Sequence, residues 1–265
     1  MNLALALLAV VSGAAVLGFV LTELLLRFGP QRVNYRGGAI VTSGGLVFLL
    51  GALPWLWLAP DLRTRWLAAT VIGFGLLGLL DDRWGTAEFK GLKGHLRALR
   101  HGRVTTGLLK AGGGLLFAAV LAAALRPGAG AVPAALLIAL SANLFNLLDL
   151  RPLRTLKAFW LAAALCLPAS PLFLAQCLGL SLPYAVREAR RRIMLGDTGS
   201  NALGGLAGAC LVSATPIGVQ VVLVAGLAAF HLWAEKHSFS AWIESHPTAR
   251  ALDGWGWREK EQGRE

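Results

Sequence analysis

The sequence predicts an all-α integral membrane protein, a polytopic bundle of about nine transmembrane helices whose polar loops lie on the cytoplasmic side. Three observations predict this fold class. Hydrophobic residues make up 56% of the chain and charged residues only 15%, whereas a soluble domain carries about a quarter of its residues as charges. The uncharged residues come in long blocks, and a helix needs roughly 20 apolar residues to cross a bilayer. Positive charge gathers between the blocks, as it does in cytoplasmic loops.

Most of the uncharged blocks are long enough to span the hydrocarbon core. The stretches without Asp, Glu, Lys or Arg are 2–22, 39–60, 66–80, 111–125, 127–148, 158–186 and 198–234. A signal peptide ahead of a soluble domain would explain only the first of them, so the other six exclude that alternative. With Pro and Gly marking the turns, we expect single helices at 2–26, 39–60, 65–82, 105–125, 131–148, 198–214 and 217–235.

The block 158–186 holds 29 uncharged residues, too many for one snug helix and too few for two full ones. Pro168 and Pro171 near its centre favour two short or tilted helices. The charge pattern supports this choice. If the basic clusters at 27–36, 84–103, 151–157, 187–192 and in the C-terminal tail are all cytoplasmic, an even number of crossings separates each cluster from the next.

This parity gives nine helices in a multi-pass plasma-membrane protein, with the N-terminus outside and the C-terminus in the cytoplasm. Residues 1–235 form the predicted transmembrane domain. Residues 236–265, which include Trp255 and Trp257, form a polar cytoplasmic C-terminal tail, expected as a short interfacial helix followed by a loose end.

The formal net charge of +11 could indicate nucleic-acid binding. In a membrane protein, basic loops that face anionic lipids and acidic substrates are the better explanation, so we expect no nucleic-acid partner. Cys166, Cys177 and Cys210 all lie inside apolar blocks, where cysteine usually serves as a packing residue.

Four polar clusters lie where predicted helices meet the cytoplasm. They are Asn34–Gly37 with Thr42–Gly45, Leu79–Asp82, Asn143–Asp149 with Arg151, Arg154 and Lys157 behind it, and Met194–Asn201. Acidic residues at membrane depth are costly and suggest a function. Because Mg²⁺ prefers oxygen ligands, the four carboxylates Asp81, Asp82, Asp149 and Asp197 at one membrane face predict a magnesium site.

Neighbouring residues extend this chemistry. Asn143 and Asn146 are spaced i, i+3 and continue to Asp149 as a polar stripe. Gly196 and Gly199 would let a ligand approach the backbone, and the helix that follows would offer free N–H groups to a phosphate. Basic residues in the intervening loops would supply cations for a diphosphate. Together these features predict phosphoryl transfer at a membrane surface.

Each cluster also has a purely structural interpretation. Asp81 and Asp82 could be boundary charges that end a helix. Asn143 and Asn146 could be hydrogen-bonding residues between helices. Gly199 and the Thr42–Gly45 segment could allow close helix packing. Taken singly, we favour the structural interpretation for each except Asp197, whereas together on one face they favour function.

Three segments carry a family resemblance: Gly-Leu-Leu-Asp-Asp at 78–82, Asn-Leu-Phe-Asn-Leu-Leu-Asp at 143–149 and Gly-Asp-Thr-Gly-Ser at 196–200. They resemble, in order, the signature motifs of the polyprenyl-phosphate N-acetylhexosamine-1-phosphate transferases. Residues 34–37 with 43–45 are similar to the N-terminal motif of that family. The family includes the phospho-MurNAc-pentapeptide translocase of peptidoglycan synthesis and the GlcNAc-1-phosphate transferases of teichoic acid and O-antigen synthesis.

The resemblance implies an enzyme with cytoplasmic active-site loops. It would transfer a sugar-1-phosphate from a UDP-N-acetylhexosamine-type donor to a polyprenyl (undecaprenyl) phosphate, with Mg²⁺ and release of UMP. The implied partners are the polyprenyl-phosphate lipid, the UDP-sugar and the membrane, with a homodimer left open. By position, Asp81 and Asp82 match the pair that deprotonates or orients the lipid phosphate.

The resemblance also assigns the remaining positions. Asp197 matches the metal ligand, and Asp149 matches a residue that is both catalytic and close to the metal. The expected substrate-binding residues are Asn34, Arg36, Lys110, Asn143, Asn146, Gly196, Ser200 and His237.

Two features depart from the family pattern. The family usually follows its Asn-Leu-x-Asp motif with Gly and a second Asp, where this chain has 150–154, Leu-Arg-Pro-Leu-Arg. A late His-rich loop is reduced to His237 and His246. A non-catalytic relative that binds lipid phosphate or nucleotide is therefore the alternative function. A transporter ranks third, because transporters place polar residues near the bilayer midplane and these carboxylates lie at predicted helix ends.

Overall fold

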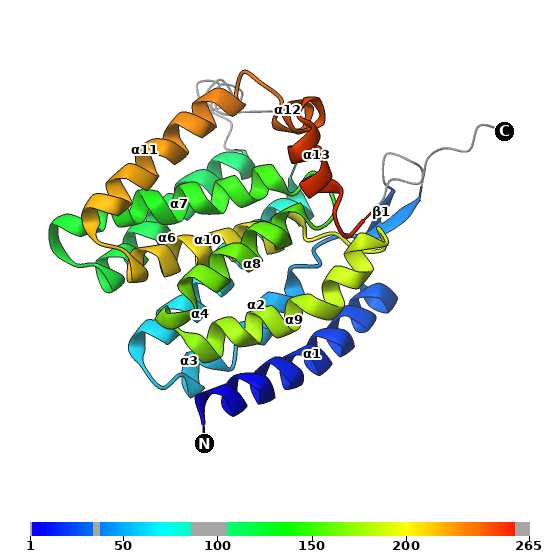
Figure 1. Ribbon diagram of the computed structural model, residues 1–265, viewed down its shortest axis with the longest axis horizontal. Helices are drawn as coiled ribbons and strands as arrows, with labels where there is room; N and C mark the ends of the chain where they lie inside the picture. The colour runs from blue at the N-terminus through cyan, green and yellow to red at the C-terminus, as the bar shows by residue number, and fades with distance from the viewer. Residues whose placement is uncertain (1, 34–37, 86–104, 258–265) are drawn as a thin grey trace.

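The computed structural model describes residues 2–33, 38–85 and 105–257 of the chain. The described residues are mainly helical (Figure 1). The long helices are α1 (Leu3–Phe28), α4 (Leu62–Trp84), α6 (Thr106–Leu125), α7 (Ala131–Leu148), α8 (Arg154–Cys166), α9 (Pro171–Ala189), α10 (Gly196–Ala214) and α11 (Ile217–Ala234). The shorter elements are β1 (Gln31–Val33), β2 (Ala39–Val41), α2 (Leu46–Ala52), α3 (Trp55–Leu58), α12 (Phe239–Ser245) and α13 (Pro247–Gly254).

Local sequence signals explain where several helices begin. Asn2 accepts a hydrogen bond from the Ala4 N–H at the start of α1. Asp61 accepts the Thr64 N–H at 2.8 Å at the start of α4, and Thr105 does the same for α6. Such side chains satisfy backbone N–H groups that have no partner within the helix.

Two helices, α8 and α9, occupy the apolar block 158–186, as predicted. A short 3₁₀ turn at Leu167–Ala169 separates them, and Pro171 is the first residue of α9. Proline lacks an N–H and fits the first helical turn, so it ends one helix and begins the next.

The predicted helix at 39–60 is wrong at its start. Residues 39–41 form β2, which pairs antiparallel with β1, and helix begins only at Leu46. The segment Thr42–Gly45 therefore lies in a loop before α2 and not inside a helix. Val41 and Gly44 form backbone hydrogen bonds with Arg192 and Met194. A segment about 150 residues later in the sequence therefore holds this stretch extended.

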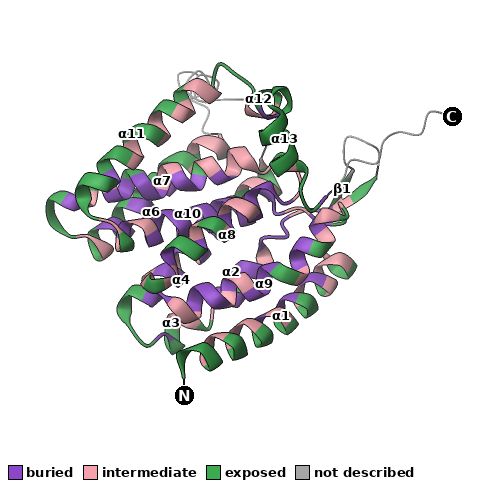
Figure 2. Cartoon of the chain, in the orientation of Figure 1, coloured by how far each residue is buried: buried purple, intermediate pink, exposed green. Residues whose placement is uncertain are grey.

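The most deeply buried helix is α10, which packs mainly against α4 and α7 (Figure 2). Its glycines make this packing close: a Cβ at Gly204 would meet the backbone of Ser141, and one at Gly208 would meet Ile138. Small residues at such positions are typical of helices packed within membranes. The first turn of α10 carries Asp197, so the core of the fold positions this residue.

Among the described residues, five helices are long and apolar enough to cross a membrane: α1, α4, α6, α7 and α11. They also leave much apolar surface uncovered, for example Leu8 at 63% and Val222 at 70% exposure. Exposed apolar surface of this extent marks contact with a membrane or partner. The part of the chain that the structure describes is consistent with an all-α membrane protein that carries one small hairpin. The full set of nine spans stays a prediction.

The orientation of the termini can be tested by cysteine labelling, because Cys166, Cys177 and Cys210 are all buried. We expect Pro60→Cys to react with an impermeant maleimide from outside intact spheroplasts. Thr248→Cys, on α13, should react only in inverted vesicles. Labelling of both positions from the same side would contradict the predicted topology.

Candidate active site

The carboxylate of Asp82, near the end of α4, caps the N-terminus of α10. It accepts hydrogen bonds from the N–H groups of Asp197 and Thr198, each at 3.0 Å, and from the Thr198 hydroxyl at 2.5 Å. Ser43 donates a further hydrogen bond at 3.1 Å. The negative charge thus lies at the positive end of the helix dipole. A side chain from another helix therefore does what a local capping residue normally does.

Asp149 directly follows α7 and also contacts the N-terminus of α10. Its carboxylate accepts a hydrogen bond from the Gly196 N–H and a long one, 3.5 Å, from the Thr155 hydroxyl. Burial, followed by repulsion from the Asp197 and Asp82 carboxylates, raises the pKa of Asp149 to about 8. Three acidic groups from α4, α7 and α10 are therefore close enough to repel one another.

Lys110 of α6 brings positive charge to this cluster. Its ammonium forms ion pairs with Asp81, at 3.0 Å, and with Asp197. All three side chains remain between 20% and 26% exposed, so a solute can reach them. One ammonium thus joins the carboxylates of two helices, Asp81 of α4 and Asp197 of α10.

The predicted phosphate cradle at the start of α10 is occupied by protein groups. Gly196 adopts a left-handed conformation, with φ +65°, and a Cβ there would lie 2.7 Å from an Asp82 oxygen. A Cβ at Gly199 would meet Gly45. The glycines make room for Asp82 and for the loop before α2, and the first N–H groups of α10 bond to Asp149 and Asp82. The expectation that these N–H groups are free for a phosphate is therefore wrong.

The two asparagines of the polar stripe on α7 have different surroundings. Asn146 donates to the Asn201 side chain at 3.4 Å, and Asn201 donates to the Asp197 carbonyl at 2.8 Å, which ties α7 to α10. Asn143 is exposed. Ser200 is fully buried and donates to the Gly196 carbonyl, so its hydroxyl stabilises the first turn of α10.

The remaining predicted binding residues lie apart from the carboxylates or outside the described chain. His237 is exposed beyond the end of α11 and stacks on Trp233, with ring centroids 5.3 Å apart. Asn34 and Arg36 fall outside the described residues. Nearby, Arg32 of β1 donates to the Asp82 backbone carbonyl at 2.6 Å, which places the hairpin next to the end of α4.

The basic residues behind Asp149 bind the C-terminal segment. Arg154 forms two hydrogen bonds with Asp253, at 2.6 and 2.9 Å, and both side chains are less than 10% exposed. Lys157 donates to two backbone carbonyls of α13, and Arg151 pairs with Glu244. These three residues of the basic loops are therefore bound by the chain itself, whereas the basic residues between 86 and 104 lie outside the described residues.

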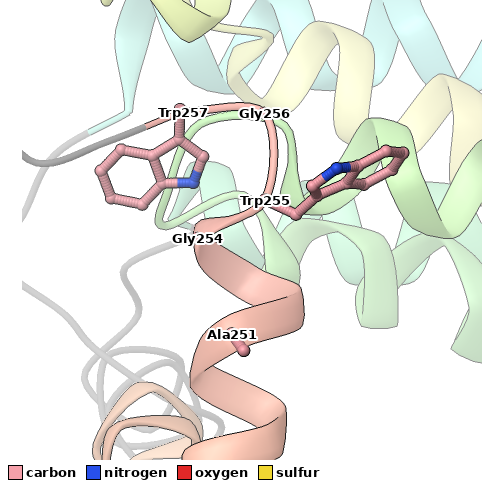
Figure 3. A pocket seen from close by; sticks show the side chains of 5 residues that line it. All are labelled: Ala251, Gly254, Trp255, Gly256 and Trp257. Atoms are coloured by element: carbon pink, nitrogen blue, oxygen red, sulfur yellow. The ribbon is translucent and has the colours of Figure 1, made fainter.

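The described part of the C-terminal segment, 236–257, contains two short helices. Helices α12 and α13 dock on the start of α8, and the expectation of a loose end after one interfacial helix does not apply to these residues. An open hollow of about 360 Å³ is lined by Ala251, Gly254, Trp255, Gly256 and Trp257 (Figure 3). None of the carboxylates lines it, so it is separate from the candidate active site.

A further buried acid, Glu188, belongs to none of the four polar clusters that the sequence singles out. Glu188, in the last turn of α9, is 3% exposed and accepts a hydrogen bond from the Leu153 N–H at 3.2 Å. Its second partner is the Leu195 N–H. Arg187 and Arg190–Arg192 surround it in the sequence, so it looked like part of a basic loop. The sequence signal that could have identified Glu188 is its position as a single acid among four arginines.

The donor set suits a magnesium ion held in part by substrate. Within the described ranges, no three His, Cys, Asp or Glu side chains converge as a ready metal cage. Mg²⁺, however, usually binds through one or two carboxylates plus phosphate oxygens and water. Asp149 and Asp197 provide two interacting carboxylates, and a cation between them would relieve the repulsion that, after burial, raises the pKa of Asp149.

In comparisons with known proteins, no protein-family model matches the chain, and no curated protein matches it. A functional assignment therefore depends on the residues and the geometry described above. The resemblance of the three motifs therefore stays a prediction from their residues and order.

The docked C-terminal segment permits a stability prediction. Asp253→Ala should destabilise the docking of α13 by about 3–5 kcal/mol, because it leaves the buried Arg154 guanidinium without its partner. Limited trypsin digestion in detergent would show this as faster cleavage at Arg250. The matched control is Glu244→Ala, which removes a pair whose acid is 53% exposed and should cost less than about 1 kcal/mol. Equal digestion of both variants would contradict the prediction.

Proposed function

We propose that the protein transfers a sugar-1-phosphate from a UDP-N-acetylhexosamine-type donor to a polyprenyl phosphate and releases UMP. The reaction would supply cell-envelope polysaccharide or peptidoglycan precursors. The observation that carries the proposal is the meeting of Asp81, Asp197 and Lys110, beside Asp82 and Asp149, at the ends of apolar helices. Accessible carboxylates and an ammonium at such a place suit phosphoryl transfer to a lipid.

In the proposed reaction, an oxygen of the lipid phosphate attacks the sugar-bearing phosphorus of the donor. The bond from that phosphorus to the bridging oxygen breaks, and UMP leaves with the electron pair. Asp81 is the better of the two acids to accept a proton from the lipid phosphate. Asp82 already accepts four hydrogen bonds, so its role is to hold the first turn of α10.

Lys110 and the two metal-side carboxylates would position the phosphates. The Lys110 ammonium can exchange its contact with Asp81 for one with a lipid phosphate, because charge-assisted hydrogen bonds to phosphate are strong. Asp149 and Asp197 would hold Mg²⁺, which neutralises charge on the diphosphate and orients it. Asn146, through Asn201, keeps the backbone of Asp197 in place.

The test is UMP release by the purified protein in detergent. Undecaprenyl phosphate, Mg²⁺ and a panel of UDP-N-acetylhexosamines are supplied, and each component is omitted in turn. Release that requires the lipid, the metal and one donor supports the transferase and identifies the sugar. No release with any donor, while a known transferase is active in parallel, contradicts it.

A second function, binding without turnover, is favoured by one observation. The cations of residues 151–157 and the N–H groups of α10 are already occupied by protein acids. A protein of this kind would retain radiolabelled undecaprenyl phosphate or UDP-sugar on a filter and release no UMP.

A further inference from the structure

Glu188 lies outside the catalytic set, yet it joins the two loops that carry the proposed metal ligands. It is 3% exposed, in the last turn of α9. Its carboxylate accepts the N–H groups of Leu153 and Leu195. An acid is costly to bury, and an apolar side chain would fill the same space at lower cost. The presence of a carboxylate here therefore requires an explanation beyond packing.

The first partner belongs to the turn that follows Asp149. Leu153 has φ +64°, a left-handed conformation that costs a non-glycine residue free energy and persists only when its surroundings enforce it. The Leu153 N–H is held by its hydrogen bond to Glu188. The next residue, Arg154, is held by its two hydrogen bonds with Asp253.

The second partner belongs to the turn that leads into Asp197. Leu195 directly precedes Gly196, whose N–H bonds to Asp149. The Leu195 carbonyl also accepts a hydrogen bond from Gly45 at 3.0 Å. One carboxylate therefore links the α7–α8 turn to the α9–α10 turn, immediately behind the two acids.

We propose that Glu188 is a positioning residue that sets the spacing of Asp149 and Asp197 for a divalent cation. The inference rests on the proposed function, because it assumes that these two acids hold the metal. Glu188 acts through its hydrogen bonds to Leu153 and Leu195, and its carboxyl group also interacts electrostatically with Asp149. Residues that orient metal ligands in this way typically change metal affinity 10–100-fold when they are replaced.

Cation binding is measured directly with Mn²⁺, whose free form gives an electron paramagnetic resonance signal that is lost on binding. Glu188→Gln keeps the shape but only one acceptor oxygen, and Glu188→Asp keeps both acceptors on a shorter side chain. We expect Glu188→Gln to weaken Mn²⁺ binding about 10-fold and to raise the Mg²⁺ concentration for half-maximal UMP release. Glu188→Asp should lie between Glu188→Gln and wild type.

The matched control is Glu23→Gln. Glu23 pairs with Arg187, the neighbour of Glu188, so this variant removes a nearby carboxylate without touching either loop, and its Mn²⁺ affinity should equal that of wild type. Wild-type Mn²⁺ affinity in folded Glu188→Gln and Glu188→Asp would overturn the positioning role alone. A wild-type protein that binds no Mn²⁺ would overturn the metal site and this inference together.

Discussion

Asp197→Asn should lower the rate of UMP release by about 10²–10³-fold, the range for removing one electrostatic contact to a transition state. Asparagine keeps the size of the side chain and removes its charge, so both the ion pair with Lys110 and the proposed metal ligand are lost. The fold should remain intact. It is the backbone N–H of Asp197, and not its side chain, that bonds to Asp82.

The measurement is UMP release by the purified variant at saturating lipid and donor, together with its unfolding temperature in detergent. Glu244→Gln serves as the control, since that acid is 53% exposed and pairs with Arg151 away from the cluster. A folded Asp197→Asn protein with wild-type turnover would exclude this acid from the reaction and favour the binding function.

Asp82→Asn should lose both stability and activity. The carboxylate accepts the N–H groups of Asp197 and Thr198, whereas the amide presents one NH₂ group that cannot accept. One backbone N–H is then left without a partner, at a cost of about 1–3 kcal/mol. The first turn of α10 would also shift, and the position of the Asp197 carboxylate with it.

The neighbouring acid separates these two effects. Asp81→Asn removes the carboxylate that faces Lys110 and leaves the cap of α10 unchanged, so it should lower UMP release at nearly wild-type stability. Unfolding temperatures and initial rates of the two variants, measured side by side, provide the comparison. If Asp82→Asn unfolds at the wild-type temperature, its capping role is wrong.

Much of the fold was predictable from local composition. Apolar blocks of membrane-spanning length mark the helices, and Pro168 and Pro171 correctly predict the break between α8 and α9. The order of the polar clusters along those helices predicts that Asp82, Asp149 and Asp197 meet, and their carboxylates do interact. These features depend on hydropathy and on residues close in sequence, which is why one sequence suffices to predict them.

The tertiary structure decided which group each polar residue contacts. The sequence alone predicts that Asp82 and Asp197 share a membrane face. It does not predict that Asp82 caps α10, that Arg154 binds Asp253 across 99 residues of chain, or that Glu188 links two turns. Hydropathy places a residue at a depth in the bilayer, whereas a hydrogen-bond partner depends on how helices pack. Close packing at α10 brings these distant side chains together, and no local pattern encodes those contacts.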